Sequence, residues 1–251
     1  MLSVMENSGL VKALQERAAR GQPAEHVEDV DGWWLRLAPH CSWWVETVLP
    51  HGNARPGELA ARVVETEKFY AAHGTTPRFQ VTPRACPEEL DAVLEKRGYR
   101  RHGSVSLQVA PTDRVRRQAG GLQVRLEERP TRAWFETWQA VNGDSRAEWD
   151  MLARVDLPST YASALIGDEV VAVGRAVADT GCAGVFSMAT LPRARGKGAA
   201  RTVLTALAGW AAANKAARMY LQVERDNGPA RRLYEGTGFT EICSYHYRDA
   251  T

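Results

Sequence analysis

Residues 186–201 read Phe-Ser-Met-Ala-Thr-Leu-Pro-Arg-Ala-Arg-Gly-Lys-Gly-Ala-Ala-Arg, and this stretch decides the fold. Its first six residues favour a β-strand, which Pro192 ends. The residues that follow place glycines and alanines where a helix must begin, so the backbone can approach a ligand closely. The N–H groups at a helix start form an anion site, and four cations add positive charge there: Arg193, Arg195, Lys197 and Arg201. The stretch therefore predicts a pyrophosphate cradle.

Two familiar phosphate-binding loops do not fit these residues. The nucleoside-triphosphate loop needs Gly-x-x-x-x-Gly-Lys-Ser/Thr, but here Gly198 follows Lys197. The dinucleotide fingerprint Gly-x-Gly-x-x-Gly fails at its third glycine, where Arg201 stands. The loop therefore argues against both of these nucleotide-binding classes.

A third pattern does fit. Residues 195–200 read Arg-Gly-Lys-Gly-Ala-Ala and resemble the Arg/Gln-x-x-Gly-x-Gly/Ala pattern of the GCN5-related N-acetyltransferase (GNAT) superfamily. That family also carries, at this distance after its loop, a strand, an asparagine and the block Ala-x-x-Leu-Tyr-x-x-x-Gly-Phe. Here these are residues 221–223, Asn227 and residues 230–239. The alternative is a coincidental Gly/Arg turn, and the second block argues strongly against it.

The resemblance implies an α+β fold with a mixed sheet, and acetyl-CoA as co-substrate. Backbone N–H groups of the loop would hold the diphosphate, and the helix dipole would add to the attraction. The residues of this loop are Arg195, Gly196, Lys197, Gly198, Ala199 and Ala200. The preceding strand opens away from its neighbour in this family. Main-chain groups near Met188 and Thr190 would then bond the pantetheine arm and polarise the thioester carbonyl. Asn227 would cap the helix opened by Pro229, bond the cofactor, or do both.

The same resemblance marks Tyr234 as the general acid that protonates the departing thiolate. The alternative is that Tyr234 only packs, because it lies four residues after Ala230 on the inward helix face. The general base is less clear, since residues 187–190 contain no acid. Glu224 is one candidate, although a solvated surface acid is its simpler interpretation. His246, Glu46 and a chain of water molecules are the others.

Composition fits an ordinary soluble globular protein, with 251 residues, 44% hydrophobic and 25% charged. A net charge of +2 is too balanced to argue for nucleic acid. The longest uncharged apolar run, residues 202–213, is too short to span a bilayer, and the N-terminus does not read as a secretory signal. The four cysteines lack metal-type spacing and read as buried thiols in a reducing cytoplasm. We therefore expect a cytoplasmic protein without a metal, nucleic-acid or membrane partner; a homodimer is left open.

The order of elements occurs twice in the chain. Residues 69–81 correspond to residues 210–223, and residues 90–99 correspond to residues 230–239. The early loop, residues 51–57, lacks the glycine–alanine pattern and contains Pro56, which removes a donor N–H. The sequence therefore predicts a degenerate GNAT-like domain at 1–110, a linker at 111–120 and a catalytic GNAT domain at 121–251, as in tandem GNAT proteins. An unrelated α+β domain at 1–110 is the alternative.

Four of the eight tryptophans fall in one predicted β-hairpin, residues 32–37 and 42–49. Strand alternation would place Trp44 and Glu46 on the same face. A carboxylate beside an indole suits a cationic acceptor, so these two residues are candidates for substrate binding. The alternative is that this face packs on the other half of the chain.

Further elements follow from hydrophobic periodicity and from the turn residues. Helices are predicted at 8–19, 56–72, 131–140 and 145–153, with another between Pro87 and Gly98. Strands are predicted at 79–81, 122–127, 160–165, 170–177, 182–191 and 242–247. The function that this order implies is direct transfer of an acetyl group, in a ternary complex, to a primary amine of a small molecule. Another acyl-CoA, another acceptor (a protein lysine or an antibiotic amine) and a non-catalytic acyl-CoA sensor are the alternatives.

Overall fold

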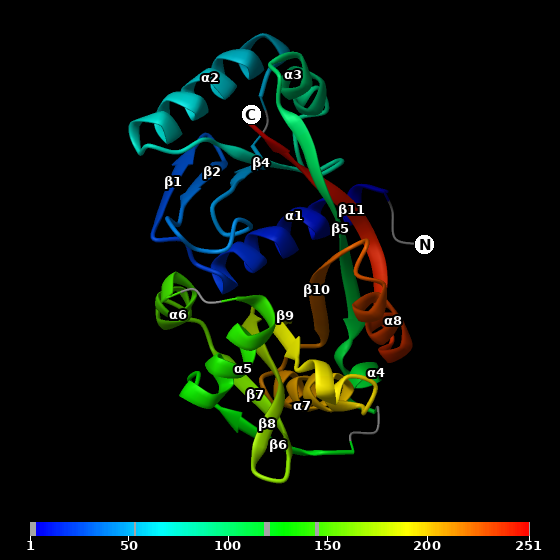
Figure 1. Cartoon of the computed structure of the whole chain (residues 1–251). Coiled ribbons are helices and arrows are strands. Elements are labelled where there is room, and N and C mark those ends of the chain that lie inside the picture. Colours follow the sequence, from blue (N-terminus) through cyan, green and yellow to red (C-terminus); the bar gives the residue numbers. More distant parts are fainter. Residues whose placement is uncertain (1–3, 53, 118–120, 144–145, 251) are drawn as a thin grey trace. The chain divides into compact units, whose positions relative to one another are not determined.

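The structure is a computed structural model that describes residues 4–52, 54–117, 121–143 and 146–250 (Figure 1). The chain divides into two compact units. Unit 1 comprises Met1–Leu107, Glu224–Asp226 and Ile242–Thr251, and unit 2 comprises Gln108–Val223 and Asn227–Glu241. The last strand of the chain, predicted at 242–247, therefore belongs to unit 1, although it was expected at the end of the second domain. The domains at 1–110 and 121–251 were predicted from the order of helices and strands along the chain, and they stay a prediction.

Unit 1 is built on a mixed sheet with strand order β1-β2-β3-β4-β11-β5. Its strands are β1 (His26–Val30), β2 (Trp33–Leu37), β3 (Val48–Pro50), β4 (Arg78–Val81), β5 (Arg100–Pro111) and β11 (Thr240–Asp249). Its helices are α1 (Val4–Gly21), α2 (Pro56–Ala72) and α3 (Leu90–Lys96). Strand β3 runs parallel to β4, with Val48 opposite Phe79, and α2 is the crossover between them. The core lies between these elements and contains Trp33, Leu35, Val63, Tyr70, Phe79, Leu90 and Leu94.

Unit 2 has strand order β10-β9-β8-β7-β6. Its strands are β6 (Gln123–Glu127), β7 (Ser159–Ile166), β8 (Glu169–Asp179), β9 (Cys182–Thr190) and β10 (Arg218–Glu224). Its helices are α4 (Thr112–Arg116), α5 (Arg132–Asn142), α6 (Arg146–Ala153), the 3₁₀ turn η1 (Pro192–Ala194), α7 (Ala199–Ala213) and α8 (Gly228–Thr237). β6 to β9 are antiparallel, whereas β10 runs parallel to β9 and α7 forms the crossover.

Helices α5 and α7 cover opposite faces of the unit 2 sheet. A Cβ added to Gly174 on β8 would meet Val203 and Leu207 of α7. The next residue of β8 points the other way, and its neighbour Tyr161 packs edge-to-face on Trp134 of α5. Thr131 caps α5 by accepting from the Trp134 N–H at 3.2 Å, which fixes where this amphipathic helix begins. The core of unit 2 is therefore two apolar layers, one on each face of the sheet.

Most predicted elements are present, and α2 has the predicted bounds, residues 56–72. The structure differs from the expected order of elements at three places. Residues 42–47 form turns and not the second strand of a hairpin. Strand β1 was not predicted, because its sequence, His-Val-Glu-Asp-Val, is polar; in the structure most of its residues are exposed. The expected linker is partly ordered, since β5 reaches Pro111 and α4 follows. Thr112 donates from Oγ1 to the Ala216 carbonyl at 2.6 Å, which ties α4 to unit 2.

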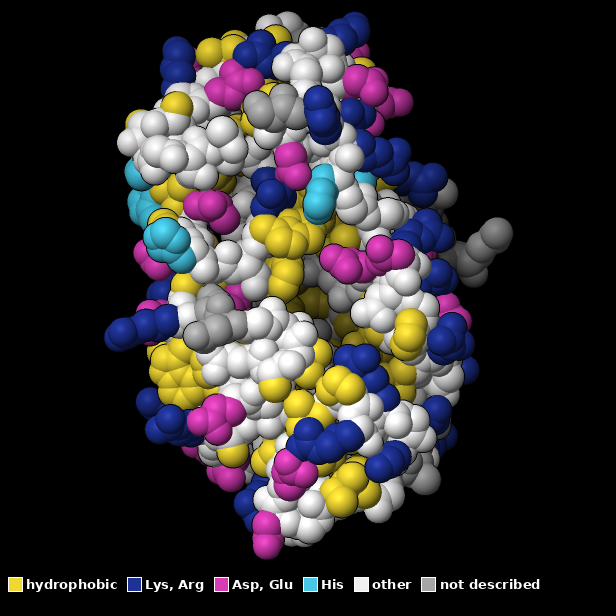
Figure 2. Space-filling view, viewed as in Figure 1, with side chains coloured by type: hydrophobic (Ala, Val, Ile, Leu, Met, Phe, Trp, Pro, Cys, Tyr) yellow, Lys and Arg dark blue, Asp and Glu magenta, His cyan; other side chains and the backbone are white. Residues whose placement is uncertain are grey.

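The surface is mixed in charge. On the face shown in Figure 2, lysine and arginine side chains are interspersed with aspartate and glutamate. Within the described ranges, no helix is both long and apolar enough to cross a membrane. The four cysteines form no disulfide with one another.

Candidate active site

Strand β9 contains a β-bulge in its second half. Its register against β8 pairs Ala189 with Val173 and Phe186 with Arg175, so the two residues Ser187 and Met188 oppose the single residue Gly174. Ser187 has a φ of 53°, a left-handed conformation that residues other than glycine seldom adopt. A bulge bends its strand and re-aims the backbone. Here it lies three residues before the end of β9.

Gly174 is required by this bulge. A Cβ at that position would lie 2.3 Å from Sδ of Met188 and 2.8 Å from Cγ1 of Val203. The methionine could move, but the branched valine sits on α7 and has little freedom. Met188 therefore occupies the space that the missing side chain leaves. Both Met188 and Thr190 stay partly exposed.

Strands β9 and β10 separate before the bulge. They pair in parallel only over Cys182–Gly184 and Arg218–Tyr220, although both strands continue beyond these residues. The last pair is Gly184 with Tyr220, so the two strands are already unpaired where β9 bends at Ser187. The opening that the sequence predicted for this strand is therefore present. It leaves main-chain groups of residues 186–190 facing away from β8, where a ligand amide could bond them.

The loop after β9 has the geometry of an anion site. Gly196 and Gly198 have φ angles of 75° and 81°, and a Cβ added to either would meet nothing within 4 Å. Helix α7 then begins at Ala199. Among the described residues, the N–H groups of four loop positions have no hydrogen-bond acceptor: Gly196, Gly198, Ala199 and Ala200. Such groups at a helix N-terminus, with the helix dipole behind them, bind anions.

The cations of the loop are not equivalent. Arg193 forms an ion pair with Glu169, and the Arg195 Nε donates to the Thr190 carbonyl at 3.3 Å. Lys197 is exposed and has no ion pair within the described residues. Lys197 is therefore the side chain best placed to neutralise a bound phosphate without first losing another contact.

Tyr234 lies on the buried face of α8. Asn227 starts this helix as predicted, because its Oδ1 accepts from the Ala230 N–H at 3.1 Å. The Tyr234 ring packs against Phe239, with ring centroids 5.9 Å apart, and only 7% of the residue is exposed. Burial raises the pKa of its phenol to about 12. Its hydroxyl has no hydrogen-bond partner in the part of the chain that the structure describes.

A family model described as "Probable histone acetyltransferase Rv0428c C-terminal" matches residues 9–248. The chain belongs to this acetyltransferase family. It is also 24% identical over 250 residues to an uncharacterized N-acetyltransferase, YobR, of Bacillus subtilis, a match that covers 95% of this chain and 98% of that protein.

Two solved structures show the same fold. A GCN5-related N-acetyltransferase from Kribbella flavida has a TM-score of 0.75 at 16% identity, covering 100% of this chain and 97% of that one. A tandem GNAT protein from the clavulanic acid biosynthesis pathway has a TM-score of 0.66 at 11% identity, covering 99% and 95%. At these identities the likeness shows the fold alone. The expected acetyltransferase architecture is thereby confirmed.

The candidate bases of this acetyltransferase lie in unit 1. Glu224 is exposed at the end of β10, next to Arg225, whose N–H donates to the Ser104 carbonyl at 2.8 Å. His246 on β11 is paired with Asp91, with 2.9 Å between Nε2 and Oδ1. Burial lowers the pKa of His246, and Asp91 acts against that effect. His246 is therefore engaged in a structural pair, whereas Glu224 is open to solvent.

The proposed acceptor residues do not lie on a strand. Trp44 and Glu46 fall in the turns at 42–47, so the predicted alternation between two strand faces is wrong for them. Trp44 packs beside Ala24, Ala38 and Val45, and Glu46 accepts weakly from the Ala38 N–H at 3.4 Å. These contacts are structural, and a role of Trp44 and Glu46 in acceptor binding stays a prediction.

The α5 face of the sheet contains a buried polar group that was not predicted from the sequence. Arg175 is fully buried, and its guanidinium lies 4.9 Å from the ring centroid of Phe186, the residue before the bulge. Burial lowers the pKa of Arg175, while Tyr161 and the buried Glu148 oppose that effect. One signal was available, because Arg175 is the one charged residue in the otherwise apolar run 170–177. Within the described residues, no cluster of side chains has the composition of a metal site.

Proposed function

We propose that this protein transfers an acetyl group from acetyl-CoA to a primary amine of a small molecule by direct attack in a ternary complex. The observation that supports it best is the continuous run formed by the bulge, the diverging strands β9 and β10, and the loop before α7. One end of this run offers main-chain groups that can bond amides, and the other end offers N–H groups to an anion. Coenzyme A has amides in its pantetheine arm and a diphosphate beyond them.

The residues of the loop fit a diphosphate. Gly196 and Gly198 adopt left-handed conformations that would strain other residues, and no side chain fills the space in front of them. Lys197 supplies a positive charge without a competing partner among the described residues. Arg195 would hold the turn through its bond to the Thr190 carbonyl, at the junction of strand and loop.

Each chemical step then has a residue to assist it. Acetyl-CoA supplies an activated acyl carbon, which the nitrogen lone pair of the amine attacks while the carbon–sulfur bond breaks. Main-chain N–H groups near Met188 would stabilise the carbonyl oxygen as it becomes negative. Tyr234 would give its phenolic proton to the departing sulfur, for which a pKa of about 12 keeps it protonated at neutral pH. The proton lost by the amine would pass to Glu224, directly or through water.

Turnover by the full chain tests this proposal. Acetyl-CoA would be incubated with a panel of small primary amines, with tertiary amines of the same skeleton as controls. Release of free thiol and the mass of the acetylated product would both be measured. We expect thiol release with some primary amines and with none of the tertiary ones, because a tertiary amine cannot form a stable amide.

Two other results would redirect the proposal. Calorimetric binding of acetyl-CoA without thiol release for any acceptor would indicate a sensor. Release only with a lysine peptide, a thiol or an alcohol would keep the fold and change the acceptor class. No binding of acetyl-CoA at all would overturn the assignment of the loop.

A further inference from the structure

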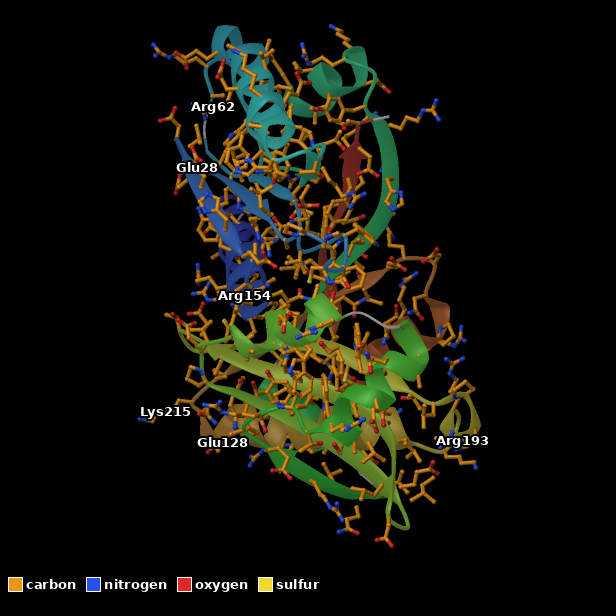
Figure 3. The ribbon with its side chains drawn as sticks, turned by 60° about the vertical axis from the view of Figure 1, so that its left-hand side comes forward. Glu28, Arg62, Glu128, Arg154, Arg193 and Lys215 are labelled. Carbon is orange, nitrogen blue, oxygen red and sulfur yellow. The ribbon has the colours of Figure 1, made fainter. Side chains whose placement is uncertain are left out.

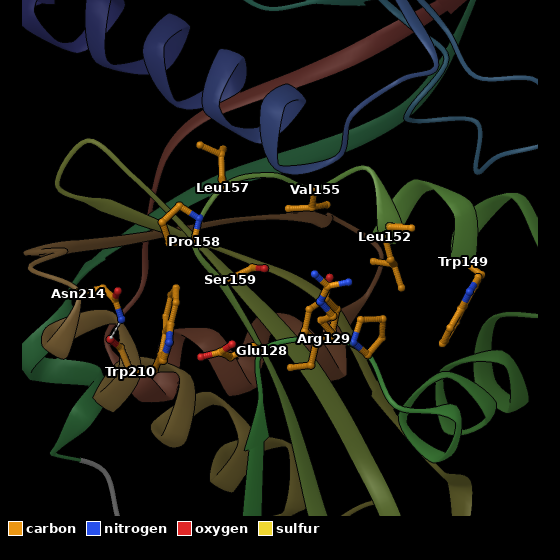
Figure 4. Close-up of a pocket in the computed structure, with 13 residues that line it drawn as sticks. Glu128, Arg129, Trp149, Leu152, Val155, Leu157, Pro158, Ser159, Trp210 and Asn214 are labelled. Carbon is orange, nitrogen blue, oxygen red and sulfur yellow. Dashed lines mark hydrogen bonds between the residues drawn. The ribbon is translucent and has the colours of Figure 1, made fainter.

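Unit 2 contains a pocket of about 630 Å³ that the proposed acetyl transfer does not use (Figure 4). Its lining comes from the segment after β6, helix α6, the segment leading into β7, and the C-terminal end of α7. Small-molecule sites in proteins typically measure ~300–1,000 Å³. The pocket therefore has the size of a ligand site and is built by one compact unit.

The pocket exists because edge strand β6 stops early. Its last residue, Glu127, pairs with Tyr161 on β7, and the chain then turns away through Glu128 and Arg129. Ser159 at the start of β7 is left without a strand neighbour on that side. Helix α6 and the C-terminal end of α7 close the resulting gap and leave a corner pocket at the edge of the sheet.

This corner lies at the opposite end of the sheet from the phosphate-binding loop. The register places Ser159, Val177 and Gly184 in one row at the pocket end. Thr190, which leads into the loop, is six residues farther along β9, or about 20 Å at the usual rise of a strand. Figure 3 shows Glu128 and Arg193 on opposite sides of unit 2. The pocket is therefore separate from the proposed diphosphate site.

Three aromatic side chains contribute to the lining. Trp210 on α7 and Trp149 on α6 both line the pocket, and Tyr161 does so from the sheet. Trp149 is 36% exposed although its indole is large and apolar, and its ring packs edge-on against Phe135. Aromatic walls of this kind offer flat apolar surface to an aromatic ligand.

Two adjacent charges of opposite sign complete the lining. Glu128 and Arg129 are both exposed, and neither has an ion pair or hydrogen bond within the described residues. In the view of Figure 4 the Glu128 carboxylate is on the Trp210 side of the pocket, and the Arg129 guanidinium points toward Ser159. A carboxylate next to an indole suits an ammonium group, and a guanidinium suits a carboxylate.

We propose that this pocket binds an aromatic α-amino acid as a zwitterion. Its ammonium group contacts Glu128 at the Trp210 side, its carboxylate contacts Arg129 and Ser159, and its ring lies against the aromatic lining. The proposal does not rest on acetyl transfer, because neither the loop before α7 nor Tyr234 takes part.

Calorimetry on the full chain without acetyl-CoA tests it with three probes that share one ring. L-Phenylalanine carries both charges, 3-phenylpropionate lacks the ammonium group, and phenethylamine lacks the carboxylate. We expect phenylalanine to bind several-fold more tightly than either of the others, since each of them lacks one of the two exposed charge pairs.

Two substitutions assign the charges. Glu128→Gln should weaken phenylalanine and phenethylamine several-fold and leave phenylpropionate unchanged, whereas Arg129→Gln should weaken phenylalanine and phenylpropionate and leave phenethylamine unchanged. Glu127→Gln is the matched control, because Glu127 is the neighbouring acid but does not line the pocket. Trp210→Leu should weaken all three probes.

Three outcomes would overturn the proposal. They are the absence of saturable phenylalanine binding at millimolar concentrations, an equal effect of Glu128→Gln on all three probes, and an effect of Glu127→Gln as large as that of Glu128→Gln. Since no readout involves acetyl-CoA, a failure here leaves the proposed acetyl transfer untouched, and a failure of acetyl transfer leaves this site untouched.

Discussion

At the scale of single residues, the candidate active site depends on two different properties. The loop depends on backbone conformation, since Gly196 and Gly198 adopt φ angles that other residues tolerate poorly. Tyr234 depends on a single hydroxyl proton at the end of a buried ring. A substitution can therefore be chosen at each position that removes the proposed function and preserves the packing.

Removing the Tyr234 hydroxyl should slow catalysis without weakening the fold. Tyr234→Phe keeps the ring against Phe239, and the lost hydroxyl has no hydrogen-bond partner among the described residues. General acid catalysis contributes about 10²–10⁴-fold, so kcat should fall in that range. Acetyl-CoA affinity and Tm should stay near the unmodified values. A lower Tm with unaltered kcat would instead show that Tyr234 only packs.

Adding a carboxylate to the loop should weaken acetyl-CoA binding. Gly198→Asp places bulk and negative charge where the phosphates would lie, and the loss should reach several kcal/mol, measured by calorimetry. Gly181→Asp is a matched control. Gly181 has a similar φ of 74° and open space around it, but it lies in the turn at the other end of β9. The loop assignment fails if both variants bind acetyl-CoA equally well.

At the scale of elements, local patterns were sufficient for much of unit 2. The strand, loop and helix from β9 to α7 could be predicted because the signals for all three lie within the segment itself. These signals are the proline that ends the strand, the glycines of the loop and the helical spacing of the apolar residues. The bulge could not be located, since it depends on Gly174 of another strand leaving room for Met188. Residues 42–47 have strand-forming composition, but tertiary contacts decide their structure. The Arg78 guanidinium, for example, lies 5.0 Å from the ring centroid of Trp43.

The polar group that ties α3 to β11 should make unit 1 sensitive to acid. Asp91 accepts from the Arg248 Nε at 2.7 Å and also pairs with His246. The Arg248 hydrogen bond is the main cause that lowers the Asp91 pKa to about 2. Because the folded pKa lies below the ordinary value of about 3.8, this stabilisation is present above pH ~4 and is lost as pH falls toward 2.

Urea unfolding of the unmodified chain and of Asp91→Asn across this pH range measures the effect. The variant should be less stable above pH ~4, and the difference should shrink as pH falls through 2. Glu88→Gln, at an exposed acid just before α3, should show no such difference. A gap between the unmodified chain and Asp91→Asn that does not shrink as pH falls from ~4 through 2 would mean that ionised Asp91 is not its source.

At the scale of the whole molecule, each unit contains a parallel strand pair joined by a helix, β3–α2–β4 in unit 1 and β9–α7–β10 in unit 2. The two connecting loops differ in packing. In unit 1 a Cβ added to Gly52 would lie 2.1 Å from the Asp31 carbonyl oxygen, and the Trp33 indole donates to the Gly52 carbonyl at 3.4 Å. The turn between β1 and β2 therefore occupies the space that stays open at Gly198.

That difference predicts one acetyl-CoA per chain. Pro56 lacks the N–H that a first helical residue would offer, and Glu58 places negative charge in the first turn of α2, where a diphosphate would have to lie. Calorimetric titration should give a stoichiometry of one. Gly198→Asp should abolish the whole binding signal, and Glu58→Gln in unit 1 should leave it unchanged. A stoichiometry of two, or a residual site in Gly198→Asp that responds to Glu58→Gln, would show that unit 1 has kept a working cradle.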